Sequence, residues 1–306
     1  MNTSLDPQSA LFLANVSRIQ ERISDANSQV TSGKKIMTAA DAPDQIGALL
    51  QLRSDQLRNT QFQSNLALAQ TDANAADDAL SASIQLMDSA TSLAAQGASS
   101  TSDAASRLSL AQQVQAIRQQ MVANSQTSVQ GRFIFSGDHD DTPVYTWDPT
   151  SANPVVTGFS PQSTRLVEDP AGGTFSVSKT AQEIYDHQDA SSAPATDNVF
   201  NALAQLQQAL ETDNTSGIND SINLLKAASD HLNSVQSFYG NVQGRIGNAS
   251  DFAAKYDVQL QTEISQKEDA DVTTAVLEMT QANTQLQAAF QMRAQMPHQS
   301  LFSYLG

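Results

Sequence analysis

The sequence contains no cysteine among its 306 residues, and aromatic residues make up only 6% of it. The absence of cysteine excludes disulfides, a thiol nucleophile and thiolate metal sites. No stretch approaches the ~20 apolar residues that a membrane-spanning helix needs, and the N-terminus lacks the basic segment of a secretory signal. We therefore expect no membrane insertion, and any export must use a route that does not read such a signal.

Basic residues are also scarce, because 16 Lys and Arg stand against 32 Asp and Glu, which gives a net charge of -16. A field of this sign repels phosphate backbones and excludes nucleic acid as a partner. The charge is uneven: residues 131–197 hold ten acidic and three basic residues, whereas residues 1–45 hold five and four. The near-neutral N-terminal segment can therefore pack against copies of itself, while the acidic middle favours solvent.

The titratable residues form no catalytic or metal-binding motif. The four histidines are scattered, and none lies four residues from another, so no zinc-binding helix face is expected; they are His139, His187, His231 and His298. The run at residues 268–271, Glu-Asp-Ala-Asp, is interpreted as negative charge at the start of a helix. We expect no catalytic residue, no cofactor and no metal site.

Helical periodicity marks both ends of the chain. Apolar residues recur there at three- and four-residue spacing, and helices with such stripes bury them against a partner. Because the two stripes lie at opposite termini, the chain must double back so that its ends meet. The residues predicted to form an assembly interface are Phe12, Val16, Ile19, Ile23, Val30, Val272, Val276, Met279, Leu286 and Phe290.

Longer helices are expected between these two arms. From Leu66 to Ala94, small and apolar side chains alternate at three and four residues, which is typical of a coiled coil. A turn at residues 99–102 precedes a further helix that ends near Val129, and helical spacing resumes from Val199. Residues 131–197 instead hold short runs of Val, Thr and aromatic residues between turn residues, which predicts a small β domain.

We therefore predict a mainly α protein with a small β insert, in which both termini build a long antiparallel, coiled-coil-like helical rod with the β domain at its tip. Residues 1–45 with 265–306 are expected to form a terminal helical assembly domain, and residues 46–130 with 198–264 a helical rod domain. Residues 131–197 are expected to form a β-rich outer domain, separable from the helices that flank it.

Two terminal segments resemble the bacterial flagellin family. The string TSGKKIMTAADAPDQIGALLQL at residues 31–52 is similar to the N-terminal signature of that family, and it places Gly33, Asp41 and Pro43 at the matching positions. The string QKEDADVTTAVLEMTQANTQLQAAFQMRAQ at residues 266–295, which includes Asp269, resembles the C-terminal helix of the family.

Two shorter strings extend the resemblance. SLFSYLG at the end of the chain, with Leu301 and Phe302, looks like the terminal tail of flagellins. FYGNVQGRIGNA at residues 238–249, with Arg245, is similar to the element that precedes the C-terminal helix. The resemblance thus covers all of the chain except the middle insert.

Within the family, VQGRFIFSG at residues 129–137 resembles the hook-filament junction members, also called hook-associated protein 3, more than filament flagellins. This resemblance implies an extracellular structural subunit of the flagellum and not an enzyme. It also implies a homo-oligomer that contacts another hook-associated protein on the hook side and flagellin on the filament side. Export would use the flagellar type III apparatus, with a cytoplasmic export chaperone as a further candidate partner.

Two alternatives to the junction subunit stay open. The opening of the chain, with Gln20-Glu21-Arg22-Ile23, is similar to filament flagellins, so a filament subunit is the first alternative. A rod-like surface adhesin is the second, although such proteins usually carry a secretion signal or heptads rich in Ile and Val, and neither stands in this sequence.

Overall fold

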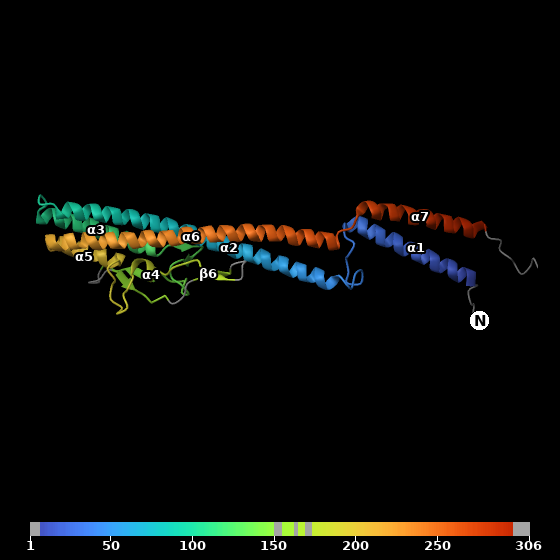
Figure 1. The fold of residues 1–306 in the computed structure, drawn as a ribbon, viewed down its shortest axis with the longest axis horizontal. Coiled ribbons are helices and arrows are strands. Elements are labelled where there is room, and N and C mark those ends of the chain that lie inside the picture. The colour runs from blue at the N-terminus through green and yellow to red at the C-terminus, as the bar shows by residue number, and fades with distance from the viewer. Residues whose placement is uncertain (1–6, 150–154, 162–164, 169–172, 296–306) are drawn as a thin grey trace, which may run out of the picture. The chain divides into compact units, whose positions relative to one another are not determined.

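Seven α-helices and three two-stranded antiparallel sheets form in the computed structural model, which describes residues 7–149, 155–161, 165–168 and 173–295 (Figure 1). The prediction of a mainly α protein with short β segments is confirmed. The chain forms two compact units, which we call the terminal unit, Met1–Asn59 with Tyr256–Gly306, and the central unit, Thr60–Lys255. The predicted boundaries at residues 45 and 265 lie near helix ends, whereas the division between the two units falls within two long helices.

The terminal unit contains α1 (Pro7–Ser32), α7 (Val272–Gln295), the first residues of α2 (Ile46–Ala98) and the last residues of α6 (Thr215–Glu268). Helices α1 and α7 pack against each other. The pairing is antiparallel, because Phe12 near the start of α1 meets Phe290 near the end of α7, and Arg22 meets Glu278.

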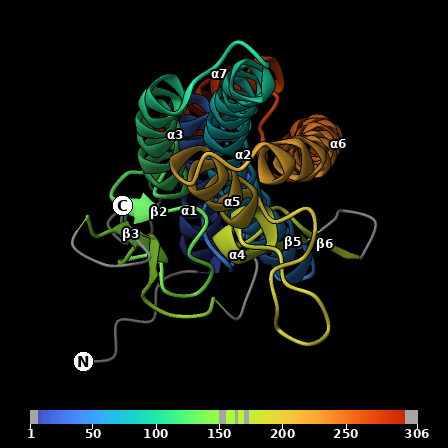
Figure 2. The ribbon, with the colours of Figure 1, turned by 90° about the vertical axis from the view of Figure 1, so that its left-hand side faces the viewer.

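The central unit is built on four helices, the rest of α2 and α6 with α3 (Ala104–Ser125) and α5 (Val199–Glu211), as the view along them shows (Figure 2). Helices α2 and α6 run antiparallel, since Gln63 Nε2 donates to the Ala253 carbonyl at 3.1 Å and Gln243 Nε2 donates to Asn74 Oδ1 at 3.2 Å. Helix α3 begins where the Asp103 carboxylate accepts the Ser106 amide at 2.8 Å, a standard N-cap.

The three-four stripe predicted on α2 faces the core of the central unit. All of its members are buried: Leu66, Ala69, Ala73, Ala76, Leu80, Ser83, Met87, Ala90 and Ala94. Small side chains bury little area each, so the unit depends on many such contacts along its length. One hydrophobic cluster collects them together with side chains of α3, α5 and α6.

The middle segment contains three separate hairpins. Strands β1 (Ser128–Val129) and β2 (Arg132–Phe133) form the first, β3 (Tyr145–Trp147) and β4 (Val155–Thr157) the second, and β5 (Leu166–Glu168) and β6 (Thr174–Ser176) the third. The first turns through Gln130 and Gly131, both with positive φ, as a type I′ hairpin loop requires. A short helix, α4 (Ala181–Tyr185), follows them.

The middle segment shares the hydrophobic core of the four helices, and its separability from them stays a prediction. Phe135, Tyr145, Ile184 and Tyr185 are buried in the same hydrophobic cluster as the side chains of the four helices. Arg165 also links the hairpins to α2, because its guanidinium lies 2.6 Å from the Asp72 carboxylate. The physical reason is size: a two-stranded hairpin is too small to bury a core of its own, so its apolar side chains pack against the helices.

Candidate assembly site

An edge-to-face aromatic contact, an ion pair and hydrogen bonds join α1 and α7 in the terminal unit. The rings of Phe12 and Phe290 meet edge to face with centroids 6.2 Å apart, and the Arg293 guanidinium lies 5.6 Å from the Phe12 ring centroid. Arg293 also donates to Ser9 Oγ at 2.8 Å. Further along, the Arg22 guanidinium donates to Glu278 at 3.2 Å. These contacts set the register of the pair, which apolar periodicity alone does not specify.

Little of the predicted interface is buried by this pairing. Val16 is buried, and half-buried positions are Phe12, Ile19, Ile23, Val30, Met279 and Leu286. Val272, Val276 and Phe290 are exposed, the last by 50%. The structure therefore brings the two predicted stripes to one helix pair and leaves much of their apolar surface open.

Further apolar side chains on the same two helices lie outside the predicted stripes. Leu11 and Leu13 on α1 are 66% and 50% exposed, and Leu277 and Met292 on α7 are 58% and 63% exposed. Three-four spacing does not select them, because Leu11, Leu13 and Leu277 lie next to a predicted stripe residue and Met292 lies two residues after Phe290. At 3.6 residues per turn these side chains point away from the predicted stripes, so apolar surface is also exposed on other sides of the two helices. We name the set of exposed apolar side chains on α1 and α7 the open apolar face.

A short backbone bridge joins the end of α1 to the start of α7. Gly33 has a φ of 70°, a conformation that favours glycine, and its carbonyl accepts the Ala270 amide at 2.9 Å. Lys34 pairs with Asp269 in an antiparallel β-bridge, and the Lys35 amide donates to the Glu268 carbonyl at 2.7 Å. Two of the family-signature residues, Gly33 and Asp269, thus belong to one backbone bridge between the end of α1 and the start of α7.

Glu268 forms a buried ion pair that the sequence interpretation missed. It ends α6, its side chain is 4% exposed, and its carboxylate accepts Lys34 Nζ at 2.5 Å and Arg53 at 2.7 Å. Burial by itself raises the pKa of this carboxyl, but the hydrogen bonds from Lys34 and Arg53 outweigh it, so the pKa lies below its ordinary value. No local signal predicts this site, because its partners lie more than 200 residues away in the sequence.

Asp271, and not Glu268, provides the negative charge expected at the start of α7. Its carboxylate accepts the amides of Thr273 and Thr274 at 3.0 and 3.2 Å and the Thr274 hydroxyl at 2.8 Å. The Thr274 bonds lower the pKa of Asp271. The expected charge is therefore present, but only one of the three acids in that run caps the helix.

The loop between α1 and α2 is organised by Asp41. Its carboxylate accepts the Met37 and Thr38 amides at 2.8 and 2.7 Å and the Thr38 hydroxyl at 2.9 Å, and these bonds, with the Thr38 amide first, lower its pKa. Pro43 lies exposed in the same loop. The two residues therefore shape a turn, and their contacts do not indicate a ligand-binding site.

The remaining signature residues lie elsewhere. Arg245, on α6 in the central unit, lies over the Phe175 ring at 4.0 Å and so fastens strand β6 to that helix. Leu301 and Phe302 lie outside the described residues. Among the helices that the structure describes, none has the length and apolar character to cross a membrane.

Comparison with known families gives two matches in sequence. Residues 7–140 match the bacterial flagellin N-terminal helical region, and residues 222–305 match the bacterial flagellin C-terminal helical region. The first match covers α1, α2, α3 and the hairpin of β1 and β2, and the second covers most of α6 and all of α7. No curated protein matches the chain.

Several solved structures share the fold. A flagellar hook-associated protein from Vibrio parahaemolyticus is 19% identical, with a TM-score of 0.64, over 75% of this chain and 100% of its own. FlgL from Xanthomonas campestris is 17% identical, with a TM-score of 0.59, over 70% of this chain and 99% of its own. Hook-associated protein-3 from Legionella pneumophila is 11% identical, with a TM-score of 0.60, over 71% of this chain and 98% of its own.

Proposed function

The chain belongs to the bacterial flagellin family, and on that premise we propose that it is a structural subunit that joins the flagellar hook to the filament by self-assembly of α1 and α7. Three of the solved structures that share its fold are hook-associated proteins or FlgL, which supports the junction over the filament. The string VQGRFIFSG at residues 129–137 supports the same choice.

The observation that carries this proposal is the open apolar face of α1 and α7. Phe290, Leu277 and Met292 are at least half exposed on α7. Burying one such side chain contributes about 1.5–3 kcal/mol, so neighbouring subunits that cover this face supply the stability that the helix pair lacks alone. Folding of the arms and assembly of the subunits are then coupled.

The proposed partners follow from this position in the flagellum. Further copies of the chain cover the open apolar face, another hook-associated protein adjoins it on the hook side, and flagellin adjoins it on the filament side. The subunit is exported through the flagellar type III apparatus and acts outside the cell, with a cytoplasmic export chaperone as a further candidate partner. The role is structural, with no catalytic step.

Phe290→Asp tests the assembly face, with Gln291→Asp as its matched control. Both changes add one negative charge to α7, but Phe290 packs against Phe12, whereas Gln291 is exposed. In cells that lack the native chain, we expect the Phe290 variant to be exported without attached filaments and the Gln291 variant to restore motility. Normal motility of the Phe290 variant would refute the assignment of this face.

Negative-stain imaging of the purified chain separates the junction from the filament. A junction subunit is expected to form short rings or to stay monomeric under mild precipitant. Long filaments built from this chain alone would show instead that it is a filament flagellin.

A further inference from the structure

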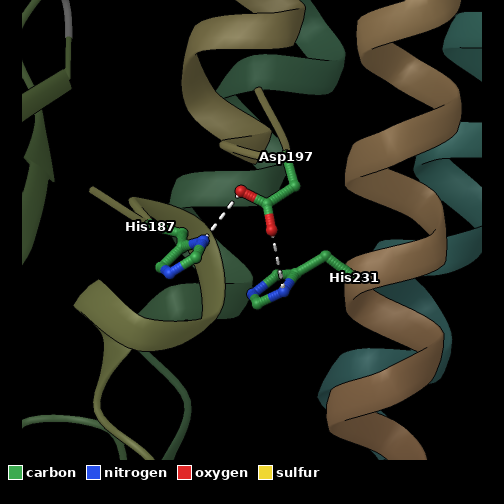
Figure 3. Close-up of side chains that lie close together, drawn as sticks. All are labelled: His187, Asp197 and His231. Carbon is green, nitrogen blue, oxygen red and sulfur yellow. Dashed lines mark hydrogen bonds and ion pairs between the residues drawn. The ribbon is translucent and has the colours of Figure 1, made fainter. Parts of the chain in front are cut away.

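Two histidines and one aspartate from three separate segments meet in the central unit (Figure 3). His187 follows α4, Asp197 precedes α5, and His231 lies on α6. His187 Nδ1 lies 2.7 Å from one Asp197 carboxylate oxygen, and His231 Nδ1 lies 3.4 Å from the other. The two imidazole rings are parallel within 3°, with centroids 5.2 Å apart.

A backbone contact determines the tautomer of neutral His231, and so whether the nitrogen that faces Asp197 carries a proton. His231 Nε2 lies 2.9 Å from the Glu183 carbonyl oxygen, and a carbonyl oxygen can only accept, so Nε2 carries the proton. In the neutral ring, the lone pair is then on Nδ1 and points toward Asp197. Two acceptors therefore face each other across 3.4 Å, an arrangement that is satisfied by a cation between them.

We propose that His187, Asp197 and His231 bind a divalent transition-metal ion, with Zn²⁺ as the best fit. Imidazole nitrogen and carboxylate oxygen are both zinc ligands, and tetrahedral bonds of about 2.0–2.1 Å place neighbouring ligand atoms roughly 3.3 Å apart. The donor atoms here lie within 4.8 Å of one another, with the two contacts to Asp197 at 2.7 and 3.4 Å. Because an imidazole binds a metal in the plane of its ring and these two rings are stacked in parallel, one ring must rotate for the three ligands to close on one ion.

The surroundings of the three ligands suit a bound ion. The bond from His231 Nε2 to the Glu183 carbonyl is the kind of outer contact that orients metal-binding histidines. Glu183 is itself held in a capping box with Thr180 at the start of α4, so this carbonyl has a fixed position. The His187 side chain is 45% exposed, which leaves room for a water molecule as fourth ligand.

The ion would fasten the segment between α4 and α5 to α6. Asp197 and His187 lie on that segment, at its two ends, and His231 supplies the contact to the long helix. The site is therefore a structural clamp within the central unit, and it is independent of the assembly face proposed for α1 and α7.

Isothermal titration calorimetry of the purified full-length chain with Zn²⁺ tests this proposal. We expect one ion per chain, a rise in the thermal unfolding midpoint on adding Zn²⁺, and visible ligand-field absorption when Co²⁺ replaces Zn²⁺. His187→Ala and His231→Ala should lose the binding and the rise in midpoint. His139→Ala is the matched control, because it removes another exposed histidine that contacts an aspartate, and it should behave as the native chain.

Asp197→Asn provides a second test that preserves side-chain size. It removes the anionic ligand, so Zn²⁺ affinity should fall by roughly tenfold or more while the circular dichroism spectrum stays native. The proposal is overturned if the native chain shows no Zn²⁺ binding. The cluster would then be only an ion pair between a protonated histidine and the Asp197 carboxylate. The proposal is equally overturned if the His187, His231 and Asp197 variants bind Zn²⁺ as tightly as the His139 variant does.

Discussion

The Arg53 guanidinium donates to the Glu268 carboxylate at 2.7 Å across 215 residues of sequence. Lys34 donates to the same oxygen at 2.5 Å, so two cations from the N-terminal side of the chain share one buried carboxylate from the C-terminal side. This contact lies beside the backbone bridge between Lys34 and Asp269. It therefore fixes the end of α1 beside the start of α7.

Arg53→Met should destabilise the terminal unit by about 1–3 kcal/mol, because it removes one of two partners from a buried carboxylate. The exposed half of the Arg53 side chain keeps the effect below that of a fully buried pair. Hydrogen exchange of the Lys35 and Ala270 amides, which form the backbone bridge, measures it directly. Arg58→Met is the control: its guanidinium is mostly exposed near Asp55, and the change should be within about ±0.5 kcal/mol.

Glu268→Gln should remove part of the acid sensitivity of the terminal unit. Because the pKa of Glu268 is lowered in the folded chain, its contribution to the unfolding free energy is complete above its ordinary value of 4.5. The contribution is lost as the pH falls through the folded-state pKa. The native chain should therefore be more stable than the variant at pH 7, and the gap should close below pH 4.5. Parallel stability curves for the two chains between pH 7 and pH 2 would contradict this assignment.

Phe135→Ala should destabilise the central unit by about 3–5 kcal/mol, the usual loss for a fully buried phenylalanine. Phe135 is 0% exposed and packs edge to face on Tyr185, so its removal opens a cavity between the hairpins and the helices. Leu166→Ala lies in the same segment but is 63% exposed, and it should change little. Urea unfolding followed by helical circular dichroism compares the two variants. A helical transition unaffected by Phe135→Ala would support the prediction that the hairpins are a separable module.

Periodicity predicted the helical core well, and the reason is local. A side chain on α2 at three-four spacing lies on one face whatever the rest of the chain does, so the stripe from Leu66 to Ala94 was predicted and is buried. The same logic put Phe12 and Phe290 on the terminal helices.

Contacts between distant segments escaped prediction. Glu268 was assigned to a helix start, although its partners are Lys34 and Arg53. The search for histidines four residues apart excluded a zinc site on one helix face, yet His187 and His231 meet through the fold. For the hairpins, the β period was correct, but composition does not say which surface buries Phe135 and Tyr145.

The amides of α1 and α7 should exchange faster than those of α6 in the central unit when the chain is monomeric. Among the described residues, the buried apolar side chains of α1 and α7 are Val16, Ala26, Ala275 and Ala282. The two helices therefore bury mostly alanine. By contrast, α6 contributes Leu225, Leu232 and Tyr239 to the large cluster. Regions with few buried apolar contacts open at low free energy.

Hydrogen exchange with mass spectrometry measures this difference, and assembly should reverse it. When neighbouring subunits cover the open apolar face, opening of α1 and α7 must also break that contact, so their amides should become protected. Protection of α6 in the central unit should change little, which makes it the internal reference. If α1 and α7 are already as protected as α6 in the monomer, then the two helices are stable without partners, and coupled folding and assembly is wrong for this chain.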